Sequence, residues 1–447
     1  MAKLVVIGGV AAGMSAAAKA RRVNPKIKIE VYTNEFDVSY GACGLPYFIA
    51  GEIVNRKRLV VRSIEKFAAQ EIKVYPGHQV ESINAEKNTL SVTNQPSGQR
   101  LDVAFDTLVI ACGASAIQPP VEGKDLEGVY KLRNLQDGEA IFQYLNRSKP
   151  KKAVIVGGGY IGLEMVEAFR RHHLEVTLLE MAPHILPNMD PDMAVLVEEY
   201  LRRQGVEVAT GEMLKKIEGN HEGRVTTVTT DCRTFTADLV LLAVGVRPNS
   251  QLAAAAGIEL GVRQAIRVND RMETNLKGIY AAGDCAVTRH LITGTEVYIP
   301  MGTTANKQGR VAGENAAGGD ARFAGVLGTG IARIIDLEIA RTGLSERECQ
   351  ENGLNYATRT IISRTTAGYY PRGGPIHIKV ITEQPEGRLL GAQIVGYAGA
   401  GKRIDTFATA LTLGATAAQL KDLDLAYAPP FAPVYDPILI ALHQSQK

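Results

Sequence analysis

The sequence contains no tryptophan, and aromatic residues make up only 6% of its 447 residues. Charged residues account for 22% and hydrophobic residues for 45%, a balance typical of a globular enzyme and not of a disordered or fibrous chain. Fifty basic residues stand against 47 acidic ones, so the net charge of +3 gives no support for binding to nucleic acid or to an anionic membrane. A chain of this length is expected to form about three domains.

Long apolar runs and paired cysteines are also missing. No uninterrupted apolar stretch approaches the roughly 20 residues that cross a bilayer, so we expect no membrane span. The first strand-like run begins at Leu4, which leaves no room for a secretion signal. The five cysteines are odd in number and lack close pairs, which argues against a disulfide scaffold and against a metal site. A reducing cytoplasm is therefore the expected compartment.

Strand-like runs alternate with helical patterns over roughly the first 320 residues, which indicates parallel sheets built from strand–helix–strand units. Two units resemble each other: KLVVIGGVAAGMSAAAKARR at 3–22 and KAVIVGGGYIGLEMVEAFRR at 152–171. Each reads as strand, glycine turn and helix, and a second strand follows. The sequence thus carries a duplicated dinucleotide-binding unit, and we predict an α/β fold with two Rossmann-like domains and a C-terminal α+β domain.

The second glycine loop has the complete GxGxxG pattern, with Gly157, Gly159 and Gly162 between a strand and a helix. The first glycine allows the tight turn, the second lets the backbone approach a pyrophosphate, and the third permits close helix packing. Glu180 ends the next strand, where it can bind a ribose 2′-hydroxyl and repel a 2′-phosphate. The pattern therefore favours a dinucleotide-binding loop over a glycine turn that binds nothing. The acid at its end favours NADH, with NADPH possible.

The first glycine loop is incomplete, because Val10 stands where the second glycine of the pattern belongs. Thr33 likewise occupies the usual acidic ribose position. A later element, GIYAAGDCA at 278–286, supplies Asp284 directly after a strand and a glycine. Its carboxylate can accept a hydrogen bond from a flavin hydroxyl, or it can cap the next helix.

Cys43 lies in SYGACGLPYF at 39–48, where a glycine and a proline suggest a turn into a helix. A thiol near a helix N-terminus is expected to have its pKa lowered, from about 8.5 to about 6, which makes it mostly thiolate at neutral pH. Cys43 is therefore the candidate redox residue. Most free cysteines are inert, and the other four keep that interpretation: Cys112, Cys232, Cys285 and Cys349.

These motifs, together with ACGA at 111–114, AVGVRPN at 243–249, YYP at 369–371 and AYAPP at 426–430, resemble the single-cysteine branch of the flavoprotein disulfide reductases. That branch includes coenzyme A disulfide reductases, persulfide reductases and NADH oxidases. The resemblance implies that NADH reduces FAD, and that FAD reduces Cys43, which exchanges with substrate sulfur. It also implies an FAD-binding domain in 1–118 and 243–323, an NAD(P)H-binding domain in 119–242 and a dimerisation domain in 324–447.

The resemblance assigns cofactor roles to two sets of residues. The FAD set comprises Gly8, Gly9, Ala11, Ala12, Gly13, Thr33, Val80, Ala111, Gly113, Asp284 and Ala305. The NAD(P)H set comprises Gly157, Gly159, Tyr160, Ile161, Gly162, Glu180 and Gly245.

The resemblance also implies a homodimer in which Tyr369 and Tyr427 of the partner subunit complete the active site. There they would bind the sulfur and donate a proton to the departing thiolate, although structural packing is the alternative. Coenzyme A phosphates would suit one face of the first helix, and the substrate set comprises Ser15, Lys19, Arg22, Ser39 and Asn306. The alternative for the helix residues is an ordinary solvated basic face.

Two departures bear on the substrate. Ala11 stands where oxidase and peroxidase members usually carry histidine, which disfavours oxygen chemistry. Ala42 stands where many coenzyme A disulfide reductases carry asparagine, which widens access to Cys43. The predicted function is reduction of coenzyme A disulfide, or of coenzyme A and other low-molecular-weight persulfides and polysulfides. The alternatives are an NADH oxidase and a flavin-bound redox sensor that does not turn over.

Overall fold

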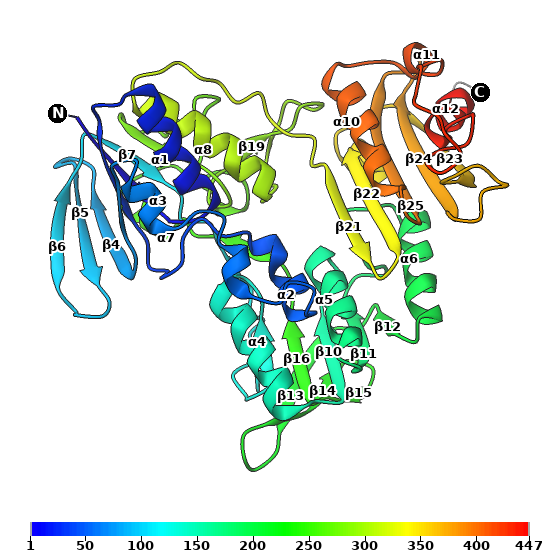
Figure 1. Cartoon of the computed structure of the whole chain (residues 1–447), viewed down its shortest axis with the longest axis horizontal. Coiled ribbons are helices and arrows are strands. Elements are labelled where there is room, and N and C mark those ends of the chain that lie inside the picture. Colours follow the sequence, from blue (N-terminus) through cyan, green and yellow to red (C-terminus); the bar gives the residue numbers. More distant parts are fainter. Residues whose placement is uncertain (1, 446–447) are drawn as a thin grey trace.

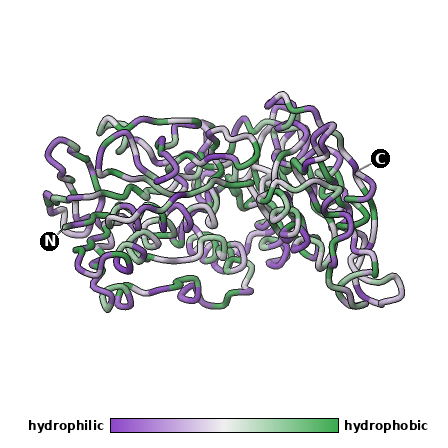
Figure 2. The backbone as a smooth tube through the Cα atoms, turned by 90° about the horizontal axis from the view of Figure 1, so that it is seen from above, coloured by the Kyte–Doolittle hydropathy of each residue, from purple (hydrophilic) through white to green (hydrophobic). Residues whose placement is uncertain are grey.

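The computed structural model describes residues 2–445, and three regions are distinct in Figure 1. Two of them contain a parallel sheet, and the third, at the C-terminal end of the chain, contains an antiparallel sheet. Hydrophobic and hydrophilic residues are interspersed in all parts of the tube in Figure 2. No helix among residues 2–445 has both the length and the apolar character needed to cross a bilayer.

The first sheet is parallel and has the strand order β18-β7-β1-β2-β3. Its strands are β1 (Lys3–Ile7), β2 (Lys28–Tyr32), β3 (Ile72–Tyr75), β7 (Thr107–Ile110) and β18 (Ile279–Ala281). Since β18 pairs with β7, a late segment of the chain completes a sheet begun at its N-terminus. The attached elements are α2 (Leu45–Ile49), α3 (Ile64–Ala68), the antiparallel strands β4 (His78–Asn84), β5 (Thr89–Asn94) and β6 (Arg100–Ala104), α7 (Gln251–Ala255), and the short pair β19 (Thr288–Arg289) and β20 (Glu296–Val297).

Helix α1 (Ala11–Val23) lies against helix α8 (Gly302–Ala316) at a distance that only glycine allows. A Cβ atom on Gly309 would lie 2.2 Å from the carbonyl oxygen of Ala12, and one on Gly313 would lie 2.1 Å from that of Ala16. The two helices therefore meet backbone to backbone. This contact fixes the start of α1, and with it the first glycine loop.

The second sheet has the order β12-β11-β10-β16-β9 and repeats the plan of the first. Its strands are β9 (Val129–Lys131), β10 (Lys152–Val156), β11 (Glu175–Glu180), β12 (Glu207–Thr210) and β16 (Leu239–Leu242). Its helices are α4 (Leu135–Ser148), α5 (Tyr160–Arg171) and α6 (Pro191–Arg203), and a small antiparallel sheet consists of β13 (Leu214–Gly219), β14 (Val225–Thr230) and β15 (Thr234–Thr236). A two-stranded connection, β8 (Ala114–Ala116) with β17 (Val246–Pro248), links the two regions.

The C-terminal region is an antiparallel sheet of order β21-β22-β25-β24-β23 with helices packed on it. Its elements are β21 (Gly330–Ile334), β22 (Leu337–Gly343), α9 (Glu346–Glu351), β23 (Tyr356–Arg364), β24 (Pro375–Glu383), β25 (Leu389–Gly396), α10 (Ile404–Thr412), α11 (Ala417–Leu420) and α12 (Pro437–Gln444). The sheet compositions agree with the α/β fold class that we predicted. The boundaries at 118, 243 and 323 stay predictions.

A buried lysine joins the second region to the C-terminal sheet. The Nζ atom of Lys379 on β24 lies 3.2 Å from Asp190 and 2.7 Å from Asp192 at the start of α6, and it also pairs with Glu346. The side chains of Lys379 and Asp190 are only 3% and 2% exposed. A charge this deeply buried is tolerated only when it is paired. Its ammonium group offsets one of the negative charges of this acidic cluster between the two regions.

The contact between α1 and α8 predicts a position-specific loss of stability. Gly309→Ala places a methyl group inside a backbone contact and should lower the free energy of unfolding by about 1–3 kcal/mol. Gly368→Ala is the matched control, because no atom lies within 4 Å of its added Cβ. Urea unfolding of the two variants checks this expectation, and equal midpoints would show that the helices can separate at no cost.

Candidate active site

A cavity of about 1140 Å³ begins at the first glycine loop and ends at Cys43. The carboxyl ends of β1, β7 and β18 open into it, which is where ligands bind in open parallel sheets. Twelve of the predicted residues line this cavity: Gly8, Gly9, Ala11, Ala12, Thr33, Cys43, Val80, Ala111, Gly113, Asp284, Ala305 and Asn306.

Gly8 and Gly13 have roles in the backbone of the first loop. Gly8 has a φ of +113°, and a Cβ there would lie 2.1 Å from the carbonyl oxygen of Ala111. A Cβ on Gly13 would lie 1.9 Å from the carbonyl oxygen of Gly8. Gly13 therefore shapes the loop from behind and does not line the cavity. The first turn of α1 faces the cavity, and a helix N-terminus in this position can bind an anionic group of a ligand.

The second loop repeats this construction. A Cβ on Gly157 would lie 2.3 Å from the carbonyl oxygen of Ala243, and one on Gly162 would lie 2.0 Å from that of Gly157. No atom lies within 4 Å of a Cβ on Gly159. The space beside Gly159 is thus free for a ligand, whereas the other two glycines are required by packing.

The remaining residues of the predicted NAD(P)H set surround the second loop. The carboxylate of Glu180 accepts hydrogen bonds from the backbone N–H groups of Gly158, at 2.7 Å, and Ala182, at 2.8 Å. Ile161 is partly exposed, and Gly245 has a φ of +105°. Within residues 2–445 the buried hydroxyl of Tyr160 has no hydrogen-bond partner, and it lies toward Gly330 of the C-terminal region.

Cys43 lies in a short 3-10 helix, Ala42–Gly44, which leads directly into α2. The residue is exposed to the cavity, yet enclosure by the surrounding protein raises the pKa of its thiol, and the carboxylates of Glu164 and Asp284 raise it further. Arg133 acts in the opposite direction. The lowered pKa that we expected from a helix N-terminus is therefore wrong for the protein groups alone, because α2 is only five residues long and burial, together with the two carboxylates, raises the pKa of the thiol.

Arg133 is a site residue that the sequence did not reveal. Its guanidinium donates to Asp284, with an Nη2–Oδ2 distance of 2.7 Å, and to the carbonyl oxygen of Ala114, also at 2.7 Å. Arg133 precedes α4 of the second region, so this ion pair connects the two parallel-sheet regions across the cavity. No local motif marks the arginine, since its partner lies 151 positions away.

The predicted substrate face of α1 is partly neutralised. The hydroxyl of Ser15 donates to Asn306 at 2.7 Å, and Lys19 forms an ion pair with Glu314 at 2.8 Å. Arg22 is exposed. Ser39 has a φ of +50°, and its backbone N–H donates to the carbonyl oxygen of Gly9 at 2.8 Å. Lys19 is therefore already paired, because α8 supplies a carboxylate, whereas Arg22 is left exposed.

The two predicted tyrosines come together in the C-terminal region. Tyr369 and Tyr427 are 77% and 45% exposed, and their hydroxyl oxygens lie 3.1 Å apart. Neither tyrosine lines the cavity that contains Cys43 of the same subunit. The hydroxyl pair thus faces outward from its own subunit.

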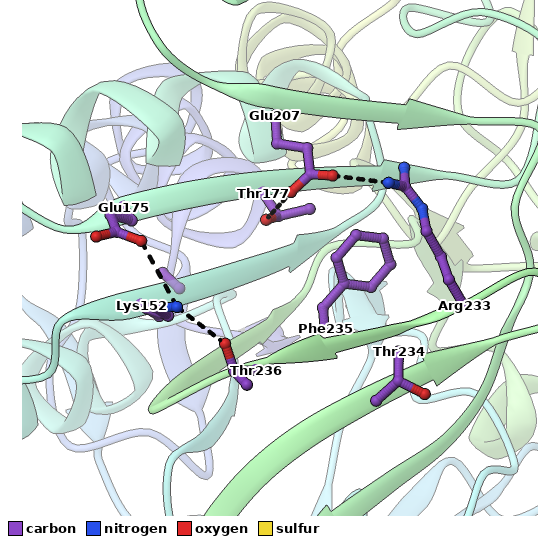
Figure 3. Close-up of a pocket in the computed structure, with 9 residues that line it drawn as sticks. Lys152, Glu175, Thr177, Glu207, Arg233, Thr234, Phe235 and Thr236 are labelled. Atoms are coloured by element: carbon purple, nitrogen blue, oxygen red, sulfur yellow. Dashed lines mark hydrogen bonds and ion pairs between the residues drawn. The ribbon is translucent and has the colours of Figure 1, made fainter.

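A second, smaller hollow of about 320 Å³ lies at the opposite end of the second sheet (Figure 3). Its charged side chains pair with each other: Lys152 lies 3.8 Å from Glu175, and Arg233 lies 2.9 Å from Glu207. Since these residues lie at the starts of strands or in the small sheet, the hollow is remote from the glycine loop at the strand ends. It has no role in the site around Cys43.

Comparison with known protein families agrees with this geometry. Residues 2–309 match the pyridine nucleotide-disulphide oxidoreductase family, and residues 331–437 match the dimerisation domain of the same family. The chain therefore belongs to this family of FAD- and NAD(P)H-dependent oxidoreductases. The predicted class of enzyme, its cofactors and its C-terminal dimerisation domain are confirmed.

Several characterised relatives extend over essentially the whole chain. An NADH oxidase of Methanocaldococcus jannaschii is 36% identical over 100% of this chain and 99% of the relative. An NAD(P)H coenzyme A polysulfide/persulfide reductase of Pyrococcus horikoshii is 39% identical over 98% and 97%. A coenzyme A disulfide reductase of Staphylococcus aureus is 31% identical over 97% of each chain.

The fold also matches a solved structure of an NAD-dependent persulfide reductase from A. fulgidus. The TM-score is 0.95 at 39% identity, and the match covers 99% of this chain and 82% of the other. The overall arrangement of the chain is thus that of this solved structure.

Because Gly157 and Gly159 have different surroundings, we predict that substitution of one impairs stability and that substitution of the other impairs NADH binding. Gly159→Val should leave the melting temperature within about 2 °C of wild type but raise the KM for NADH at least about tenfold, because the side chain fills the space of a pyrophosphate. Gly157→Ala should instead lower the melting temperature, since its Cβ meets the carbonyl of Ala243. Thermal melting and initial rates check both variants, and a destabilised Gly159→Val would contradict the assignment.

Proposed function

We propose that the protein uses NAD(P)H to reduce coenzyme A disulfide, or coenzyme A and other low-molecular-weight persulfides and polysulfides, through Cys43. The supporting observation is that the Cys43 thiol opens into the same cavity as the glycine loop at the start of α1. Cys112 also reaches this cavity, but burial raises its thiol pKa strongly. Cys43 is thus the thiol suited to exchange with a small sulfur substrate.

The cavity suits FAD on three grounds. Gly8 forms a turn in which a side chain cannot fit, the helix N-terminus of α1 faces inward, and Asp284 offers a carboxylate at the other wall. Bound there, FAD would carry the two electrons of NADH to Cys43. Arg133 would orient Asp284, because the two are already joined at 2.7 Å. We further propose that 1–118 and 243–323 form this FAD-binding domain and that 119–242 forms the NAD(P)H-binding domain.

In the proposed reaction the Cys43 thiolate attacks one sulfur of the substrate disulfide. A new bond forms between Cys43 Sγ and that sulfur, the substrate S–S bond breaks, and the second sulfur leaves as a thiolate that takes up a proton. The two electrons of NADH then reduce the mixed disulfide, which releases the bound sulfur as a second thiol. One disulfide, one NADH and one proton yield two thiols and NAD⁺.

Two features support a substrate of the coenzyme A class. Relatives named as coenzyme A disulfide reductase and as coenzyme A polysulfide/persulfide reductase align over nearly the whole chain. Arg22 and Arg58 are exposed basic side chains available to anionic phosphates, whereas Lys19 is already paired. Ala42 beside the thiol leaves room for short persulfides as well as for a bulky disulfide.

We propose a homodimer in which the hydroxyl pair of Tyr369 and Tyr427 reaches the Cys43 of the other subunit. The support is their exposure, their mutual contact at 3.1 Å and their position in the dimerisation domain. A phenol hydroxyl there can donate a proton to the leaving thiolate. The free cysteines of the described chain are compatible with work in a reducing compartment, for which we propose the cytoplasm.

The second candidate function is that of an NADH oxidase, because a relative with that name aligns over the whole chain. Against it stands Ala11, which lines the cavity at the position in the first glycine loop where oxidase members usually carry histidine. The two functions separate in one assay: oxygen uptake that far exceeds thiol production with saturating disulfide would favour the oxidase.

Substitution of the proposed redox residue should abolish sulfur reduction without loss of the flavin. Cys43→Ser is expected to lower kcat with coenzyme A disulfide at least about 1000-fold, since an alcohol cannot carry out thiol–disulfide exchange. NADH oxidation, thiol release and flavin absorbance measure this. Equal rates in both proteins would remove Cys43 from the mechanism.

The contribution of the partner's tyrosines can be tested by complementation. Cys43→Ser subunits and Tyr369→Phe/Tyr427→Phe subunits should each be nearly inactive as pure dimers. Random reassociation of equal amounts should restore about a quarter of wild-type activity, because half of the dimers are mixed and each mixed dimer has one intact site. No recovery in mixtures shown by mass spectrometry to contain mixed dimers would place the tyrosines in their own subunit's site.

A further inference from the structure

Three regions of the subunit meet just after the helix that follows Cys43. The 3-10 helix that contains Cys43 leads directly into α2, and Glu52 comes three residues after the end of α2. The Glu52 carboxylate lies 2.7 Å from Arg171 at the end of α5 and 3.0 Å from Arg333 on β21 of the C-terminal sheet. One carboxylate thus ties the segment after Cys43 to both of the other regions.

A buried acid of α5 completes this junction. Glu167 is only 7% exposed, and its carboxylate lies 3.0 Å from Arg171 and 3.3 Å from Arg333. It also accepts a hydrogen bond of 2.8 Å from the backbone N–H of Ile335, in the turn after β21. Since a buried carboxylate is stable only when its charge is compensated, the two guanidinium groups are needed where they lie. Together with Glu52 these side chains form a closed set of four ion pairs.

Other contacts hold α2 at the same place. His172, the residue after α5, has its Nε2 atom 2.7 Å from the carbonyl oxygen of Ile49, the last residue of α2. The guanidinium carbon of Arg333 lies 6.0 Å from the ring centre of Tyr47 on α2. The apolar side of α2 packs against α5 in one buried hydrophobic cluster. A short helix whose end and one face are fixed leaves little freedom for Cys43, which lies two residues before it.

We propose that Arg333 is a positioning residue for Cys43 of its own subunit. Its guanidinium holds Glu52 and covers Tyr47, and through them it fixes α2 and the direction from which the thiol reaches into the cavity. The inference rests on the proposed role of Cys43 in sulfur reduction. It gives the C-terminal region two separate tasks, since its tyrosine pair is proposed to serve the thiol of the other subunit.

The position of the thiol matters for both halves of the proposed reaction. Its sulfur has to lie in line with the S–S bond of the substrate for exchange, and close to the flavin for reduction. A displacement of about 1 Å can lower a rate about 100-fold although the reacting groups are unchanged. By contrast, transfer of hydride from NADH to the flavin does not involve Cys43. Loss of Arg333 is therefore expected to slow sulfur reduction and to spare flavin reduction.

The first test compares two activities of Arg333→Met in the flavin-loaded enzyme. Its kcat with coenzyme A disulfide should fall at least about tenfold, whereas NADH-dependent reduction of ferricyanide, which takes electrons from the reduced flavin, should stay within about twofold of wild type. Arg333→Lys keeps the positive charge and should recover part of the lost rate. Arg388→Met is the matched control and should keep both rates, because this arginine of the same region pairs with Glu383 at 2.8 Å and is 39% exposed, against 42% for Arg333.

A second variant tests the same contact with less effect on folding. Glu52→Gln removes the carboxylate that Arg333 holds and leaves the buried Glu167 paired with both guanidinium groups. It should lower kcat with coenzyme A disulfide at least about threefold and spare ferricyanide reduction. Rates are expressed per bound flavin, so that loss of folded protein does not imitate the result. Equal losses of both activities, or no loss in either variant, overturn the proposal.

Mixed dimers test whether Arg333 acts on its own subunit. In a dimer of one Cys43→Ser subunit and one Arg333→Met subunit, the remaining Cys43 belongs to the subunit that lacks Arg333. Reassociation of equal amounts should therefore give only the average activity of the two pure dimers, in contrast to the recovery expected for the tyrosine variants. Recovery to about a quarter of wild-type activity would show that Arg333 serves the other subunit and would overturn the proposal. Full activity of Cys43→Ser would instead reject the proposed function, whatever the result for Arg333.

Discussion

The site depends on one steric constraint that occurs twice: a backbone carbonyl occupies the space where a side chain would begin. The carbonyl of Ala111 lies against Gly8, and that of Ala243 lies against Gly157. In both places the neighbouring strand comes so close that only glycine fits, and the chain must turn sharply into a helix. The positive ends of α1 and α5 are thereby aimed at two separate ligand spaces, and the rest of the molecule holds these two ends at a fixed separation.

Much of this architecture could be predicted from the sequence because it depends on residues that lie close together in the chain. The two glycine loops, their strands and the turn at Cys43 are contiguous patterns, and their physical causes act over a few residues. The position of Glu180 at the end of β11 was also predictable, and its role beside a ribose stays a prediction. The discontinuous first sheet followed from the strand-like run before Asp284.

What escaped prediction depends on pairs of residues far apart in the chain. Arg133 matters because it meets Asp284, and Lys19 is neutralised because α8 brings Glu314 beside it. The pKa of Cys43 was predicted in the wrong direction because a short helix is a weak local source of potential, while the burial that raises the pKa, and the charges of Glu164 and Asp284 that add to it, come from other elements. The charges around a side chain are set by the assembled fold, so a local sequence motif does not predict them.

The buried contact of Lys379 with Asp190 ties the C-terminal sheet to helix α6. A subunit that pairs through its C-terminal region therefore sets the orientation of its nucleotide loop at the same time. A motion of one region relative to the other would have to break this buried ion pair.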